Sequence, residues 1–140
     1  MHSVPILPLL LSAVAAWLFG AVYYGVLGRK WLAAQGKTME QCTAENAARS
    51  AVAKGLPFAL SFVAEVLMAG ILYGVIFHVG TWTAKAGVIT GALCWLGFVL
   101  TTIIVNNAYT FRRPLLTTID SLHWLGVLAT MGAILGAMGG

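Results

Sequence analysis

The sequence predicts an all-α integral membrane protein: four transmembrane helices in a compact bundle, with one short cytoplasmic surface helix. Of its 140 residues, 60% are hydrophobic and only 9% are charged. Its mean hydropathy of +0.91 lies far above the range of soluble domains. Four apolar runs are each long enough to cross the roughly 30 Å hydrocarbon core of a bilayer as a helix. Residues 1–140 are therefore expected to form a single transmembrane domain.

The first helix is expected over about residues 6–27. This stretch could be mistaken for a secretory signal, but no basic segment precedes it, and its apolar run exceeds the roughly 7 to 15 residues of a signal core. It ends in an aromatic and basic anchor that includes Tyr24, Arg29 and Trp31. We therefore interpret it as a retained transmembrane helix.

A polar segment follows the first helix. Thr38 and Gln41 have the spacing of a capping box, in which two side chains satisfy free N–H groups at the start of a helix. Glu45 and Arg49 have the spacing of an i,i+4 ion pair. The segment is therefore expected to form the short helix on the membrane surface.

The remaining helices follow from the other three apolar runs. The second is expected over about residues 56–77, with Pro57 in its first turn, where the missing N–H costs least. The third is expected over about residues 86–105, after a short turn in which Trp82 is an interfacial anchor. The fourth is expected over about residues 121–138, after a polar connection.

The basic residues predict the orientation. Seven of the eight lysines and arginines lie between the first and second helices or between the third and fourth, and only Lys85 lies on the opposite side. The positive-inside rule therefore places both basic connections in the cytoplasm and both termini outside. Arg112 and Arg113 of the second connection are candidates to bind an anionic lipid headgroup.

Two stretches resemble a known family. The first contains Tyr23-Tyr24-Gly25 and Gly28-Arg29-Lys30-Trp31, and the second contains Trp95-Leu96-Gly97, Asn106-Asn107, Arg112-Arg113-Pro114 and Gly132-Ala133-Ile134. Together they resemble the small bacterial four-helix membrane proteins grouped as domain of unknown function seventeen sixty-one, over nearly the whole chain. Members commonly have tryptophan-tyrosine-glycine-proline where this chain has Tyr23-Tyr24-Gly25-Val26. The resemblance implies four helices in a bacterial membrane, and it implies no activity. Together with the positive-inside rule, it leads us to expect the inner membrane, with both termini on the periplasmic side.

Glu65 is the most informative single residue, because it is the only charged residue of the second apolar run. At 1.5 Å per residue it lies about 13 Å in from Leu56, near the bilayer midplane. An acid there is costly, so it is expected to face protein or water. It is either a neutral carboxyl that donates a hydrogen bond to a neighbouring helix, or a proton or cation site. We favour the structural role, because no second ionisable residue is predicted at that depth.

Other polar residues are candidates to join Glu65 in an intramembrane site. They are Ser61, Asn106 and His123, of which the last two are expected nearer the cytoplasmic face. His78 or His123 could also hold a pigment as a single ligand, although the two lie near opposite faces and cannot both ligate one haem. No other cofactor and no metal site is predicted.

Three pairs of glycines have the GxxxG spacing that allows close contact between transmembrane helices. At 100° per residue, the pair on the second helix lies about 140° and 180° away from Glu65. The glycines and the acid are therefore expected to face different neighbours. The pairs are Gly70 with Gly74, Gly87 with Gly91, and Gly132 with Gly136.

These features predict a non-catalytic protein. No catalytic triad, paired carboxylates or phosphate loop is visible. The net charge of +4 gives no nucleic-acid-binding face, because the basic residues flank apolar runs. The main hypothesis is a structural or accessory subunit that packs in a homo-oligomer or a larger membrane complex, surrounded by lipid. The alternative is a small channel or transporter for protons, cations or a small solute, with Glu65 on the path.

Overall fold

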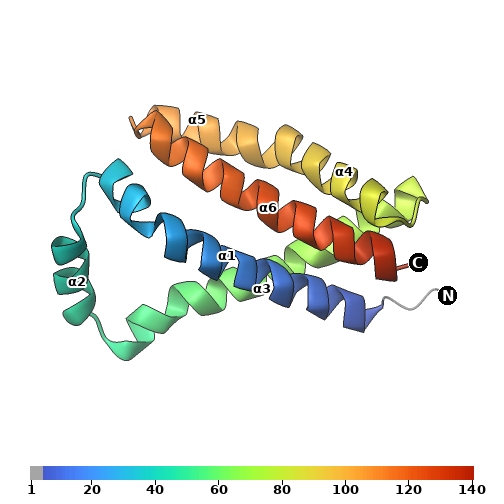
Figure 1. The fold of residues 1–140 in the computed structure, drawn as a ribbon, viewed down its shortest axis with the longest axis horizontal. Helices are drawn as coiled ribbons and strands as arrows, with labels where there is room; N and C mark the ends of the chain where they lie inside the picture. The colour runs from blue at the N-terminus through green and yellow to red at the C-terminus, as the bar shows by residue number, and fades with distance from the viewer. Residues whose placement is uncertain (1–4) are drawn as a thin grey trace.

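The computed structural model describes residues 5–140, and over these residues the chain is helical with short connections (Figure 1). Four stretches are long and apolar enough to span a membrane: Ile6–Ala34, Ala51–Val79, Ala84–Tyr109 and Pro114–Met138. The chain is therefore a multi-pass membrane protein. The predicted fold class is confirmed.

The first two spans are longer than expected at their shared connection. Helix α1 runs over Ile6–Ala34 and α3 over Ala51–Val79. The Ser50 hydroxyl accepts a hydrogen bond from the Ala53 N–H, which caps α3 one turn before the apolar run begins. The expectation that Pro57 lies in the first turn is therefore wrong, since it lies in the second turn of the longer helix.

Helix α2, Met39–Ala47, is the predicted surface helix, and it bridges the ends of α1 and α3 (Figure 1). Its capping box is confirmed: the Gln41 N–H donates to Thr38 Oγ1, and the Thr38 N–H donates to Gln41 Oε1. None of its residues is buried, and most of them are exposed.

The ion pair of this region differs from the expected one. Glu45 pairs with Lys37, with Nζ and Oε2 2.8 Å apart. Arg49 lies beyond the end of α2, so it does not have the helical position that an i,i+4 pair with Glu45 requires. The hydrogen bond from Lys37 lowers the pKa of the Glu45 carboxyl.

The third span is one continuous helix with a change of winding in its middle. Helix α4 (Ala84–Cys94) passes into a π-helical segment, η1 (Trp95–Leu100), and then into α5 (Thr101–Tyr109). The fourth span, α6 (Pro114–Met138), begins seven residues before the expected start at residue 121, with its proline at the first position.

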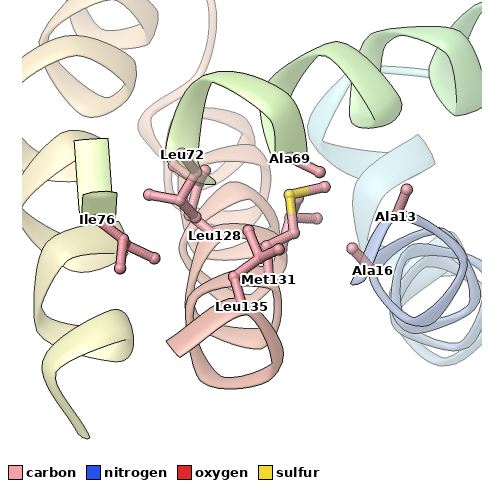
Figure 2. Close-up of a cluster of buried hydrophobic side chains, with 9 residues drawn as sticks. Ala13, Ala16, Ala69, Leu72, Ile76, Leu128, Met131 and Leu135 are labelled. Atoms are coloured by element: carbon pink, nitrogen blue, oxygen red, sulfur yellow. The ribbon is translucent and has the colours of Figure 1, made fainter. Parts of the chain in front are cut away.

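Helix α6 is the central element, packed against α4 on one side and α1 on the other (Figure 1). Helix α3 crosses α1 and contributes to the same core. Figure 2 shows the side chains of the three helices meeting, with the sulfur-containing side chain of Met131 in their midst. The buried cluster consists of Ala13 and Ala16 of α1, Ala69, Leu72 and Ile76 of α3, and Val127, Leu128, Met131 and Leu135 of α6.

Two glycine pairs bring α4 and α6 into backbone contact. A Cβ atom at Gly87 would overlap the Gly132 carbonyl, and one at Gly132 would overlap the Gly87 carbonyl. Gly91 and Gly136 meet backbone atoms of Leu128 and Thr83 in the same way. No side chain fits along this seam.

The glycine pair of α3 has no such contact within the described chain. A Cβ atom at Gly70 would meet only Leu9 Cδ1, at 4.0 Å, and one at Gly74 would meet nothing within 4 Å. The expected seam on α3 therefore has no partner helix in this chain, because α1 crosses α3 and α6 reaches it on the face of Ala69 and Leu72.

Candidate functional site

A cavity of about 520 Å³ lies between α1, α3 and α6. This volume is within the range of roughly 300 to 1,000 Å³ that is common for small-molecule sites. The lining is mostly apolar and aromatic, with a few polar side chains. It consists of Trp17, Gly20, Ala21, Tyr24 and Gly25 of α1, Phe58, Ser61 and Glu65 of α3, and His123 and Trp124 of α6.

Glu65 lies in this cavity, halfway along α3, about 21 Å from either end of the helix. The residue is only 2% exposed, and its Oε2 has no hydrogen-bond partner among the described residues. The expectation that it faces protein is confirmed. The expected hydrogen bond to a neighbouring helix is not made by this oxygen, so Glu65 does not act as a simple interhelical link through it.

His123 lines the same cavity from α6 and is 6% exposed. Its Nε2 faces Gly20, where a Cβ atom would lie 2.8 Å away, so α1 needs a glycine there to admit the imidazole. Its Nδ1 has no hydrogen-bond partner among the described residues. Four rings enclose His123, with centroids 4.8 to 6.2 Å away: Phe19, Tyr23, Tyr24 and Trp124.

Two of the other predicted polar residues separate in the structure. Ser61 lines the cavity, where its hydroxyl accepts a hydrogen bond from Trp17 Nε1 at 3.1 Å and donates to the Phe58 carbonyl at 2.9 Å. Asn106 is exposed on α5 and is not part of the lining, because α5 packs chiefly against α6 and the π-helical segment. The structure thus brings Ser61, Glu65 and His123 together and leaves Asn106 out.

A carboxylate that the sequence pattern does not single out lies one turn from His123. Asp120 Oδ1 accepts hydrogen bonds from the Tyr24 hydroxyl at 2.7 Å and from Trp31 Nε1 at 2.9 Å. The Tyr23 hydroxyl donates to the neighbouring carbonyl of Ile119 at 2.7 Å. The aromatic residues at the end of α1 therefore hold α6 through hydrogen bonds, in addition to any role at the membrane surface.

The remaining candidate residues lie away from the cavity. His78 is exposed, with Nδ1 2.7 Å from the Gly74 carbonyl of its own helix. Arg113 is exposed and donates from Nη1 to the Ala33 carbonyl at 2.9 Å, so it also closes the end of α1. Arg112 is exposed. Within residues 5–140, no group of three metal-ligating side chains is present.

A second cavity of about 650 Å³ adjoins the first, because Tyr24, Gly25, Phe58 and Ser61 line both. It continues between α1 and α3 toward α2, where the two long helices diverge (Figure 1). Arg29 is among the residues that line this part. The site of Glu65 and His123 is therefore adjacent to a gap that leads to one end of the bundle.

A family model described as "Protein of unknown function (DUF1761)" matches residues 7–136. The chain belongs to the DUF1761 family. The match includes every residue that lines the first cavity, and it confirms the resemblance noted in the sequence. No curated protein and no solved structure matches the chain. Because the DUF1761 description carries no activity, function has to be argued from the site itself.

Proposed function

We propose that this DUF1761 protein is a non-catalytic membrane transporter that binds a small solute in the cavity between α1, α3 and α6. One observation carries the proposal: Glu65 and His123 are both buried, both have a polar atom without a hydrogen-bond partner among the described residues, and both line the same cavity. A buried polar group without a partner costs roughly 1 to 3 kcal/mol. A solute that supplies the missing partners would offset that cost.

The depth of the site supports transport over a purely structural role. Ionisable groups within the membrane are rare and commonly mark pathways for substrates, ions or protons. Glu65 lies halfway along its helix, and the second cavity continues from it toward α2. A purely structural carboxyl is expected to have its hydrogen bonds satisfied by a neighbouring helix. For Glu65 Oε2 no such bond is present among the described residues.

The charge distribution supports a bacterial inner-membrane location. Seven of the eight basic residues lie in or beside the connection that contains α2, or directly before α6. By the positive-inside rule these connections face the cytoplasm, and both termini face the periplasm.

Solute binding can be tested on the purified protein in mild detergent by thermal unfolding with a panel of hydrophobic cations, anions and neutral molecules. At least one class is expected to raise Tm saturably, by an amount that corresponds to about 2.7 kcal/mol at a concentration 100 times Kd. The same solute should cross proteoliposome membranes more slowly with the Glu65→Gln variant.

A matched pair of variants assigns the binding to the cavity. Gly25→Leu should abolish the shift, because Gly25 lines the cavity and has open space around its Cβ position. Gly97→Leu should preserve it, because Gly97 has equally open space but is not part of the lining. The proposal fails if no solute gives a saturable shift, or if Gly25→Leu responds like the wild type.

A self-associating subunit is a second candidate, supported by the surface of α3. All residues of 51–60 are exposed, and Gly74 has no atom of the described residues within 4 Å of its Cβ position. Small residues such as glycine allow close packing of helices in lipid, so a second copy of the chain could pack against this surface of α3. Native mass spectrometry in mild detergent should show a dimer or larger species that Gly74→Leu weakens. A monomer under every gentle condition would exclude this role.

A further inference from the structure

We infer that the cavity takes a hydrophobic organic cation, with Glu65 as its counter-ion. This inference deepens the proposed solute-binding function and rests on it. It identifies the class of solute from three features of the lining: the hydrogen-bond donors that are already used, the aromatic side chains, and the position of the opening.

Three of the hydrogen-bond donors in the lining, those of Trp17, Ser61 and Tyr24, are engaged within the protein. Trp17 donates its N–H to Ser61, and Ser61 donates its hydroxyl to the Phe58 carbonyl. Tyr24 donates its hydroxyl to an aspartate of α6. These three donors are not available to an anionic solute, and the donors that are left, on His123 and Trp124, line the cavity together with the Glu65 carboxylate, which repels anions. Within residues 5–140, the Oε2 atom of Glu65 has no hydrogen-bond partner, and a carboxylate oxygen accepts hydrogen bonds and attracts positive charge.

Aromatic side chains make up much of the remaining lining: Trp17, Tyr24, Phe58 and Trp124. A cation within about 6 Å of an aromatic ring is attracted by the ring quadrupole, and quaternary ammonium groups are commonly bound in cages of such rings. A small inorganic cation would need several oxygen ligands instead. Within residues 5–140, no group of three metal-ligating side chains is present to supply them. The lining therefore fits a cation whose charge is spread over an apolar body.

The opening of the cavity suits a hydrophobic ion. Phe58 lines the cavity and is 64% exposed, and Ala21 and Gly25 on the facing side of α1 are exposed as well. These residues lie within apolar spans, so the opening between them faces the lipid side of the bundle. A cation that partitions into the membrane could reach Glu65 through this gap.

The test uses two ions of the same shape and opposite charge, tetraphenylphosphonium and tetraphenylborate. Equilibrium dialysis of the full-length protein in mild detergent should show saturable binding of the phosphonium and none of the borate. Glu65→Gln should weaken phosphonium binding about tenfold or more, because it removes the buried counter-charge. Glu40→Gln makes the same chemical change on the exposed surface of α2 and should leave binding unchanged.

A third variant separates the charge from the fold. Glu65→Asp keeps the carboxylate and should retain more phosphonium binding than Glu65→Gln, with gel filtration and circular dichroism checking that both variants are folded. The inference is overturned if folded Glu65→Gln binds the phosphonium as tightly as the wild type, or if folded Glu65→Asp binds it no better than Glu65→Gln.

The two proposals fail in different ways. One outcome overturns only the cation inference. In this outcome the phosphonium does not bind, whereas tetraphenylborate or a neutral solute does, and Gly25→Leu abolishes that binding. The cavity is then a solute site, but not one for cations. If no solute of any class binds saturably, the proposed function itself is wrong.

Discussion

Two carboxylates of the membrane-spanning helices, Asp120 and Glu65, differ in their hydrogen bonding. Asp120 accepts hydrogen bonds from Tyr24 and Trp31, and it thereby joins α6 to the end of α1. Glu65 has an oxygen with no partner among the described residues and lines a cavity. We therefore assign Asp120 to stability and propose a functional role for Glu65.

The role of Asp120 predicts the effect of removing its donors. Tyr24→Phe and Trp31→Phe should each lower the free energy of unfolding by about 1 kcal/mol, since each loses one hydrogen bond within the bundle. Tyr109→Phe is the matched control, because Tyr109 is 83% exposed and should change stability by less than about 0.5 kcal/mol. Unfolding in mixed detergent micelles measures all three. Equal stability of all three variants and the wild type would contradict this role of Asp120.

At the level of single residues, the sequence predicts that Glu65 faces the protein. It does not predict how the rest of the site is arranged. A single acid within an apolar run is too costly in lipid, so its inward orientation follows from its position alone. His123 and Asp120 lie near the start of an apolar run, where polar residues are ordinary. Their burial depends on how α1 and α6 are rotated toward each other, with Gly20 admitting the imidazole, and that rotation is not a property of either segment alone.

Between elements, the contact of α4 with α6 depends on the absence of side chains. In Gly132→Val the added methyl groups would overlap the Gly87 carbonyl, and the helices would have to separate. We expect the free energy of unfolding to fall by about 3 kcal/mol, which is at the upper end of the effects of overpacking. Gly74→Val should leave the fold of a single chain nearly unchanged, because no atom of residues 5–140 lies within 4 Å of its Cβ position. Thermal unfolding in detergent compares the two variants. An equal loss of stability in both would refute the assignment of the glycine seam to α4 and α6.

The GxxxG spacing identifies candidate seams without saying which ones meet. All three pairs have the same spacing, but only those of α4 and α6 are in mutual contact.

The helix ends are also predicted poorly from the sequence. Apolar runs mark the part of a helix that lipid covers, whereas α3 begins at the polar cap of Ser50 and continues into the membrane. The π-helical winding of Trp95–Leu100 has no signal in the hydrophobic pattern.

On the scale of the whole molecule, the cavity exists because α1 and α3 cross and then diverge toward α2 (Figure 1). Four spans and their order follow from the apolar runs. The crossing of α1 over α3 does not, because helices of similar composition can cross at several angles. The polar site could therefore be predicted as a set of residues on separate helices, but not as a cavity with an opening.

The distribution of basic residues predicts the orientation of the whole bundle. Alkaline phosphatase, which is active only in the periplasm, should be active when fused after Gly140 and inactive when fused within residues 35–50. Green fluorescent protein at the same two sites should give the reverse pattern, fluorescing only in the cytoplasm. The opposite pattern for both reporters would reverse the assigned topology, because seven of the eight basic residues would then face the periplasm.

The central claim is that a solute in the cavity contacts the Glu65 carboxyl, and infrared difference spectroscopy of that group tests it most directly. Tetraphenylphosphonium added to the wild-type protein should shift or bleach a carboxyl band, because the hydrogen bonding or ionisation of Glu65 changes on binding. The band should be absent from the difference spectrum of Glu65→Gln and present in that of Glu40→Gln. Identical spectra for the wild type and Glu65→Gln would contradict the claim.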